Sequence, residues 1–479
     1  MKTLLTLTVY TLLVLHNVLF AQSNKSAIKD IDVQLNKMAE TEHLSGVVLI
    51  AKNNEILYHK AFGFSNRADH ILNRPNTRFN MASMTKMFTG MAILQLVESS
   101  KLSLDQTVGS YLPDYPNRAV TDSVTIHQLL THTSGMGNFW EELDKVPKEK
   151  YRSIDDYIPL FINKPLLFKP GSRYQYSNSG YTLLGKIIEQ VTGLTYFEYI
   201  RQHILLPARM YKTDALELDE AQPQMATGYT MSLTQPGQWK NNNFANVIKG
   251  GPAGGYYTTA GDLLRFSNIV RGQQLLNKKS TELYITGKIK YDKGSYAYGM
   301  SADTINDHAV FGHTGGHFGI ANEFLVCPDL GYTVVIMTNG EVENYWAVSN
   351  LIKSKLLGSS DGTNNYYFTK SVIEAIVSGR DESGIKIIAA DEKKYKLRES
   401  VIDRWAYHLL FDKQNRSAIA LFKFNVKSFP ESAGAIYSLA ESYRLTGERQ
   451  KARANYEQYL KLEPDDDEVR EKIKSLTDK

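Results

Sequence analysis

The chain has 479 residues, of which 42% are hydrophobic and 22% charged, a composition typical of a folded globular protein of about three domains. Its 55 basic and 51 acidic residues leave a formal net charge of +4, so no basic excess indicates binding to nucleic acid or to a membrane surface. The single cysteine, Cys327, excludes a disulfide framework or a cysteine-rich metal site within the chain.

The first residues predict an export signal. Lys2 precedes an apolar run from Leu4 to Phe20, and Ala21-Gln22-Ser23 follows it, with a small residue at the expected cleavage site. This order is typical of a secretory signal peptide. We therefore expect residues 1–21 to be removed and the mature protein to be exported, to the periplasm of a bacterium or out of the cell, with no later membrane span. An uncleaved membrane anchor is the alternative, which the polar residues inside the run disfavour.

Residues 22–358 are predicted to form one α+β domain. Strand pairs lie near both ends of this segment and helices lie between them, so we expect one antiparallel sheet built from both ends, flanked by helices and accompanied by a helical subdomain. A hairpin is expected around Asn53-Asn54. The helices are predicted over residues 26–42, 84–97, 179–191, 259–270 and 344–357, and the strands over residues 45–52, 55–64, 309–314, 320–327 and 332–339.

The composition changes near residue 365. Of the 114 residues from 366 to 479, 40 are charged, against 66 in the preceding 365 residues. The stretch Gly358-Ser359-Ser360-Asp361-Gly362-Thr363 is typical of a linker. We therefore expect a linker at 359–367 and a separate all-α domain at 368–479.

The C-terminal domain repeats itself every 34 residues. The repeat is carried by Ala418, Phe422 and Pro430, which recur as Ala452, Tyr456 and Pro464. The period resembles that of tetratricopeptide repeats, each a pair of antiparallel helices. Two units are fewer than the ~3 that a stable array needs, so residues 369–397 are expected to add a degenerate unit or a cap. A protein partner bound through these repeats is one expectation, and a helical appendage of another kind is the alternative.

The pair Ser83 and Lys86 offers a nucleophile and a base. Residues three apart at the start of a helix share one face, and burial lowers the pKa of a lysine. The pattern Ser-x-x-Lys occurs three times, at Ser26, Ser83 and Ser383. Only Ser83 opens a long apolar helix, so this pair is the candidate that a serine hydrolase would use.

Two further stretches complete the requirements of acyl transfer. In Tyr176-Ser177-Asn178, a tyrosine flanked by cations can hold phenolate character and shuttle protons, and the amide can orient the lysine and the substrate. His313-Thr314-Gly315-Gly316 occurs once and is expected to close a strand, with glycines that let a substrate approach the backbone. A backbone N–H after these glycines can join that of Ser83 in an oxyanion hole.

The order Ser-x-x-Lys, Tyr-x-Asn, His-Thr-Gly resembles that of the serine β-lactamase-like family. This family includes class C β-lactamases, D-alanyl-D-alanine carboxypeptidases, D-amino-acid peptidases and esterases. The stretches Leu129–Gly135, Pro170-Gly171 and Pro252–Gly255 strengthen the resemblance, which covers about residues 25–358. It implies a β-lactamase-like fold and no cofactor or metal. It also implies roles for the following residues: nucleophile Ser83, acid/base pair Lys86 and Tyr176, substrate-binding Asn178, His313, Thr314 and Gly315, and oxyanion-hole N–H groups of Ser83 and Gly316.

The expected function is that of an exported serine hydrolase acting through an acyl-enzyme on a small peptide, amide or ester. Class C β-lactamases carry Lys-Thr-Gly where this chain has His313-Thr314-Gly315. A lysine supplies a fixed charge for the β-lactam carboxylate, whereas a histidine is mostly neutral at pH 7, which disfavours efficient β-lactam hydrolysis. Two alternatives stay open: a β-lactamase, and a non-catalytic protein that docks a partner through the fold and the repeats.

The remaining histidine patterns are expected to be structural. His132 lies in Thr-His-Thr-Ser-Gly and is expected to fix a turn by hydrogen bonds. His308, His313 and His317 are close in sequence, but no carboxylate completes a ligand set at a useful spacing. We therefore expect neither a second base nor a metal here.

Overall fold

The computed structural model describes residues 25–232, 235, 237–291, 294–340, 342–379 and 394–477. The chain divides into two compact units. The first holds the residues up to Tyr229 together with Asn241–Ser349, and the second holds Thr230–Lys240 together with the residues from Asn350 onward. The expected signal peptide and the pattern at Ser383 lie outside the described residues.

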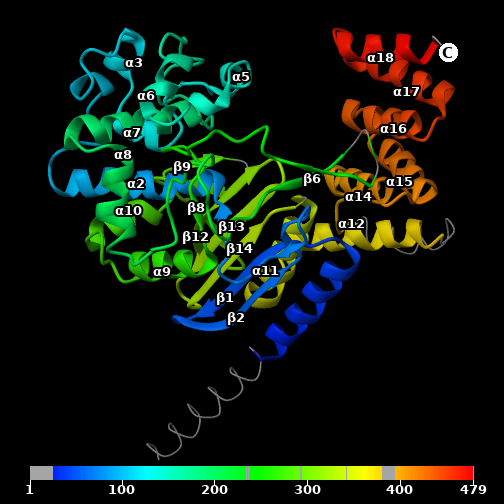
Figure 1. Cartoon of the computed structure of the whole chain (residues 1–479), viewed down its shortest axis with the longest axis horizontal. Helices are drawn as coiled ribbons and strands as arrows, with labels where there is room; N and C mark the ends of the chain where they lie inside the picture. Colours follow the sequence, from blue (N-terminus) through cyan, green and yellow to red (C-terminus); the bar gives the residue numbers. More distant parts are fainter. Residues whose placement is uncertain are drawn as a thin grey trace, which may run out of the picture. The chain divides into compact units, whose positions relative to one another are not determined.

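An antiparallel sheet forms the centre of the first unit (Figure 1), and among the described residues its strand order is β2-β1-β14-β13-β12-β11-β10-β9. Strand β1 pairs with β14 along its whole length, with Gly46 opposite Thr338. The two ends of the domain therefore build one sheet, as the sequence predicts. The strands are β1 (Gly46–Lys52), β2 (Glu55–Phe62), β9 (Ile289–Tyr291), β10 (Gly294–Tyr296), β11 (Ser301–Ile305), β12 (His308–His317), β13 (Ile320–Cys327) and β14 (Tyr332–Thr338).

Local chemistry explains the hairpin between β1 and β2. Asn53 and Asn54 have φ angles of 48° and 74°. Two successive left-handed residues make the type I′ turn that matches strand twist, and asparagine tolerates that conformation. Every residue of β13 and β14 is buried, which requires cover on both faces of the sheet.

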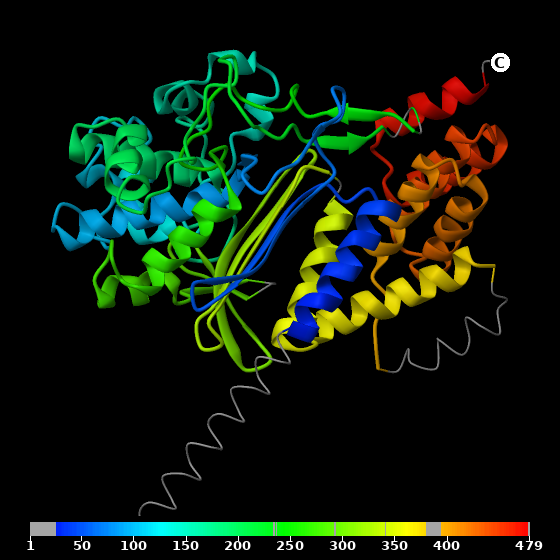
Figure 2. The ribbon, with the colours of Figure 1, turned by 60° about the horizontal axis from the view of Figure 1, so that its bottom comes forward.

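Helices supply that cover in two layers. Figure 2 shows the helix over residues 25–41, in dark blue, on the face of the sheet opposite α2 (Lys86–Glu98). Helix α9 (Ala260–Arg271) packs against β1 and β14, and α7 (Asn178–Thr192) packs on α2. The remaining helices of this unit include α3 (Arg118–Ser123), α4 (Ile126–Leu130), α5 (Trp140–Leu143), α6 (Ile154–Tyr157), α7 (Asn178–Thr192), α8 (Tyr196–Ile200), α9 (Ala260–Arg271), α10 (Lys278–Ile285) and the first part of α11 (Val342–Leu357).

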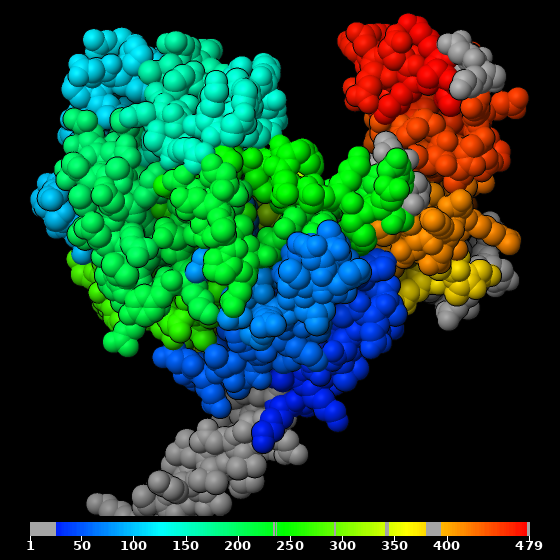
Figure 3. Space-filling view, viewed as in Figure 1, coloured from blue at the N-terminus to red at the C-terminus, as the bar shows by residue number. Residues whose placement is uncertain are grey.

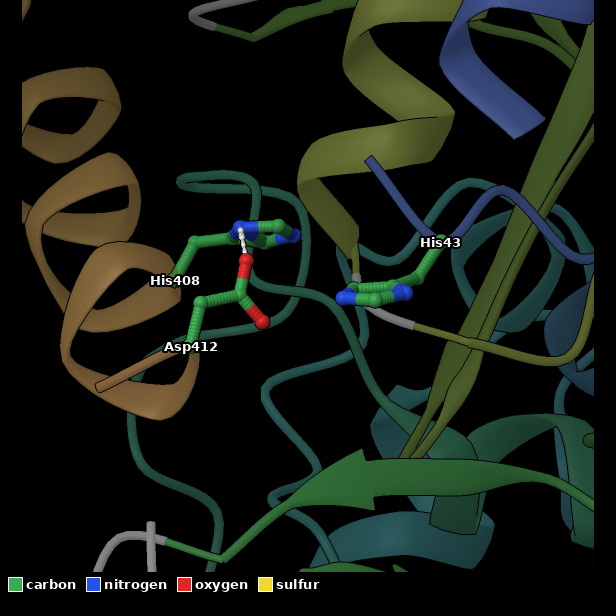
Figure 4. Close-up of side chains that lie close together, drawn as sticks. All are labelled: His43, His408 and Asp412. Carbon is green, nitrogen blue, oxygen red and sulfur yellow. Dashed lines mark ion pairs between the residues drawn. The ribbon is translucent and has the colours of Figure 1, made fainter. Parts of the chain in front are cut away.

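The second unit is mostly helical, as the sequence predicts. Its helices after α11 are α12 (Asp361–Val377), α14 (Glu399–Phe411), α15 (Asn415–Ser428), α16 (Ala433–Leu445), α17 (Arg449–Leu462) and α18 (Asp467–Thr477). Helix α14 packs on α15 and α16 packs on α17. The fully buried Ala418 and Ala452 leave room for each pair to approach closely. On α14, His408 Nδ1 lies 3.6 Å from Asp412 Oδ2 (Figure 4).

Two features of this unit differ from the predicted linker followed by an all-α domain. Helix α12 begins at Asp361, so most of the expected linker 359–367 is helical. The Ser360 hydroxyl accepts the Thr363 N–H and caps this helix. A hairpin of β6 (Tyr229–Met231) and β7 (Trp239–Asn241) also contributes to the unit, with the Trp239 ring 4.8 Å from that of Phe411. No described helix combines the length and apolar character that a bilayer crossing needs.

Candidate active site

A strained turn presents Ser83 at the start of α2. Ser83 lies in a 3-10 turn over Ala82–Thr85 that leads directly into the helix. Ala82 has a φ angle of 45°, which is unusual for alanine. The Asn80 side-chain oxygen accepts the Ala82 N–H at 2.8 Å, and the Thr85 hydroxyl donates to the Ala82 carbonyl at 2.9 Å. Strain held in place by such bonds is typical of functional sites.

Lys86 is buried beside this serine. Its Nζ atom lies 3.3 Å from Ser83 Oγ, 2.7 Å from Asn178 Oδ1 and 2.5 Å from the Ala253 carbonyl oxygen. Burial lowers the pKa of Lys86 well below its ordinary value of 10.5. A neutral amine has two N–H groups, which Asn178 and Ala253 accept, and one lone pair, which then faces Ser83. The arrangement can therefore take the proton of the serine hydroxyl.

Tyr176 lies against the same lysine. Lys86 Nζ is 4.7 Å from the centre of the Tyr176 ring. Burial raises the pKa of Tyr176 above its ordinary value of 10, and the Ser83 side chain opposes this rise to a smaller extent. The phenolate character considered from the sequence is therefore wrong for the resting site, because burial disfavours the charged form. Tyr176 is a neutral phenol and can donate a proton.

Asn178 receives its orientation from Asn138, a residue that sequence reasoning missed. The backbone N–H and the side-chain NH₂ of Asn178 both donate to Asn138 Oδ1, at 2.7 and 3.0 Å. The Asn138 side-chain NH₂ donates in turn to the Tyr176 carbonyl at 3.1 Å. This leaves the Asn178 oxygen directed at Lys86. Only its position in the sequence could have indicated this role, because Asn138 lies three residues after the Leu129–Gly135 stretch.

His313 is buried within β12 and neutral. Its Nε2 lies 2.9 Å from the Tyr296 hydroxyl, and its Nδ1 lies 2.5 Å from the Thr314 carbonyl oxygen. The carbonyl requires a proton on Nδ1, so Nε2 accepts from Tyr296. Burial, and to a smaller extent Lys86, lowers the pKa of His313 to about 3. Sequence reasoning missed Tyr296, which lies on β10, and placed the strand end at Thr314, whereas β12 runs on to His317.

Gly315 and Gly316, which follow Thr314 on β12, have different surroundings. A Cβ atom on Gly315 would lie 2.2 Å from the Met81 carbonyl oxygen, so the missing side chain lets the nucleophile turn approach β12. A Cβ on Gly316 would meet nothing nearer than 3.9 Å. Gly316 and Ser83 line the same cavity. Thr314, expected to bind substrate, is exposed and is not among the residues that line it.

The other histidines considered from the sequence lie in three separate places. His132 has a φ angle of 59°, its Nδ1 accepts the Ser177 N–H at 3.1 Å, and its ring lies 4.2 Å from that of Tyr176. Its side chain therefore holds the backbone at Ser177, just before α7. His308 and His317 occupy opposite ends of β12. His308 pairs with Asp329 at 2.6 Å, and His317 stacks on Trp140.

Comparisons with known proteins agree with this geometry. The family model described as Beta-lactamase matches residues 34–351. A protein of Bacillus subtilis (strain 168) named as a penicillin-binding protein, PbpX, is 30% identical over 321 residues, which are 66% of this chain and 76% of that protein. The penicillin binding protein from Bacillus halodurans has a TM-score of 0.62 at 32% identity, covering 67% of this chain and 99% of that one. The octameric penicillin-binding protein homologue from Pyrococcus abyssi has a TM-score of 0.64 at 25% identity, covering 72% and 81%. The chain therefore belongs to the β-lactamase family and is a serine hydrolase.

Proposed function

We propose that the protein is an exported hydrolase that transfers the acyl group of a small peptide, amide or ester to Ser83 and releases the acid with water. One observation carries the proposal: the buried Lys86 amine lies 3.3 Å from the Ser83 hydroxyl oxygen at the start of α2. A neutral amine in that position is a general base at neutral pH. The binding-protein alternative offers no chemical reason for such an arrangement.

Lys86 and Tyr176 carry out different proton transfers in this reaction. Lys86 takes the hydroxyl proton as Ser83 Oγ bonds to the carbonyl carbon, and the N–H groups of Ser83 and Gly316 donate to the developing oxyanion. Tyr176 donates its proton to the leaving group as the C–N or C–O bond breaks, and the Lys86 ammonium then returns a proton to Tyr176. The same pair takes a proton from water as the water oxygen bonds to the acyl carbon, and returns a proton to Ser83 Oγ as the ester bond breaks and the acid is released.

The relatives named as penicillin-binding proteins support a site that reacts with amides of the β-lactam kind. His313 opposes efficient β-lactam turnover, because a neutral imidazole supplies no charge for the β-lactam carboxylate. We therefore rank peptide, amide and ester hydrolysis above β-lactamase activity. Asn178 positions Lys86 and the substrate in this scheme, while Thr314 and Gly315 contribute the strand that borders the site.

We further propose that residues 1–21 direct export to the periplasm or the medium, and that the second unit is a tetratricopeptide-like array that docks a protein partner. The starts of α14, α16 and α18, at Glu399, Ala433 and Asp467, are spaced by 34 residues. That spacing supports the repeat assignment. The segment expected as a third unit, 369–397, holds the end of α12 and residues that are not described.

Covalent labelling tests the proposed nucleophile. Intact mass is measured after incubation with a penicillin and, separately, with a fluorophosphonate, for the wild type and for Ser83→Ala. Ser26→Ala is the matched control, because Ser26 also precedes a lysine by three residues but is exposed. We expect one adduct on the wild type and on Ser26→Ala and none on Ser83→Ala. An adduct that persists on Ser83→Ala, or its absence from the wild type with both reagents, contradicts the proposal.

A further inference from the structure

A pocket beside Ser83 has an apolar wall. Its volume is about 760 Å³ when the part that is open to solvent is included. Gly316 lines it together with Ser83. In Figure 3 the surface of the first unit is hollowed between segments coloured green. Leucine, valine and aromatic side chains from four separate segments line the pocket: Phe139, Trp140, Leu143, Tyr157, Leu216, Leu218 and Val247.

The pocket lacks formal charge. Among the described residues that line it, none is Asp, Glu, Lys or Arg. The one titratable imidazole, His317, has its Nε2 3.2 Å from the Ala245 carbonyl oxygen, and burial lowers its pKa. It is therefore neutral at pH 7. A carboxylate or ammonium placed in this pocket would lose hydration without gaining a charged partner.

The charged side chains beside Leu216 and Leu218 form ion pairs with one another. Glu217 lies between Leu216 and Leu218 in the sequence, and its carboxylate is 3.0 Å from Lys249 Nζ. Arg152 also pairs with Glu217, and with Asp219. These four groups are held in ion pairs with one another, so we do not expect them to bind a charged substrate.

The position of the pocket identifies the part of the substrate that it holds. It is lined by Ser83 and Gly316, which meet the reacting carbonyl, but not by Tyr176 or His313. The leaving group must depart beside its proton donor, which is Tyr176 in the proposed mechanism. The pocket therefore lies on the acyl side of the scissile bond.

We propose that this pocket is an acyl-binding site for an uncharged, hydrophobic acyl group, of the size of a medium-length alkyl chain or an aromatic amino-acid side chain. The inference rests on the function proposed above, since it names the substrate class of the same site. Trp140, Leu218 and Val247 determine the specificity by burying the acyl group. Each methylene that enters the pocket raises kcat/KM roughly fourfold, as expected for its removal from water. Acyl groups with a carboxylate are rejected.

A series of p-nitrophenyl esters tests the proposal with the full chain. The acyl groups are acetate, butyrate and hexanoate, with hemisuccinate as the charged counterpart of butyrate. We expect kcat/KM to rise at least tenfold from acetate to hexanoate and to be at least tenfold lower for hemisuccinate than for butyrate. Equal values across the neutral esters, or a preference for hemisuccinate, overturn the proposal.

Two variants locate the preference. Leu218→Lys places a cation in the wall and is expected to reverse the order of butyrate and hemisuccinate. Leu206→Lys adds the same charge at a leucine that is 44% exposed and does not line the pocket, and it is expected to keep the wild-type order. The fluorophosphonate-labelled fraction shows whether Leu218→Lys has folded. If it has not, Leu218→Ala replaces it, with an expected fall in the ratio of kcat/KM for hexanoate to that for acetate.

This design separates the two proposals. If the wild type hydrolyses none of the esters through Ser83 and Ser83 is not labelled, the proposed function is contradicted. Ser83-dependent acetate turnover without an acyl preference contradicts only the acyl-binding site.

Discussion

The side-chain oxygen of Asn178 accepts a hydrogen bond from Lys86 Nζ at 2.7 Å, and the amide that carries it is itself held by Asn138. An uncharged acceptor in this position lets the buried lysine lose its proton. We therefore expect the charge of residue 178 to control the protonation state of Lys86, the base in the proposed mechanism.

Asn178→Asp is expected to move the pH dependence of hydrolysis. A carboxylate beside Lys86 favours the ammonium and raises the pKa of the lysine. The acid limb of kcat/KM should then shift to higher pH by at least one unit, with a loss of activity at pH 7. The pH profile with p-nitrophenyl acetate is the measurement. Asn415→Asp, at an exposed residue of the second unit, is the control and should leave the profile unchanged. An unshifted profile for Asn178→Asp would show that Lys86 is not the base.

Tyr176→Phe is expected to separate poor from good leaving groups. The ring against Lys86 and His132 remains, and only the proton donor is lost. Hydrolysis of an anilide should fall about 100- to 10,000-fold, the usual contribution of a general acid. Hydrolysis of a p-nitrophenyl ester, whose leaving group needs no proton, should fall much less. Paired kcat measurements on the two substrates decide the matter, and equal losses on both would argue against the donor role.

Gly315→Ala is expected to damage the nucleophile turn. The added Cβ would lie 2.2 Å from the Met81 carbonyl oxygen, so the backbone must shift. We expect a loss of about 1–3 kcal/mol in the free energy of unfolding, as for an overpacked core, and at least a tenfold loss of kcat. Gly316→Ala is the matched variant, because its Cβ has open space, and its stability should stay within about 0.5 kcal/mol of the wild type. Urea unfolding measures the free energy of unfolding of both variants, and hydrolysis of p-nitrophenyl acetate measures kcat.

Stability is expected to fall as the pH is lowered below the ordinary pKa of histidine. The folded-state pKa of His313 is lowered from 6.5 to about 3, so between these values the unfolded chain binds the proton and the folded protein does not. The stabilisation is fully present above about pH 6.5 and is lost progressively toward pH 3, by at most ~1.4 kcal/mol per pH unit for one proton.

The free energy of unfolding at pH 5 and pH 6.5 tests this expectation. The difference between the two values should shrink in His313→Gln and stay the same in His70→Gln, since His70 is exposed. A wild-type difference that survives in His313→Gln would assign the effect to other buried groups, such as His132, whose pKa burial also lowers.

Much of the fold follows from local rules. The Asn53-Asn54 turn and the neighbouring hairpin were predicted because turn chemistry depends on adjacent residues. The 34-residue period was visible in Ala418 and Ala452, since a helix pair needs small residues at repeated positions. The linker 359–367 was misjudged because a run of glycine and serine is typical of linkers, whereas Ser360 caps α12. Asn138 and Tyr296 carried no motif, so only their contacts identify them.

By itself, the sequence determined the order of the elements, the sheet built from both ends of the first domain and the pairing of Ser83 with Lys86, because these depend on backbone periodicity and on spacing within one helix turn. Only the tertiary structure decided the chemical state of the site. Lys86 meets Asn178 and Ala253, which are 92 and 167 residues away along the chain. Burial among groups from such distant segments, rather than the identity of the residue, lowers the pKa of Lys86 and raises that of Tyr176, which suits them to the base and acid roles proposed above.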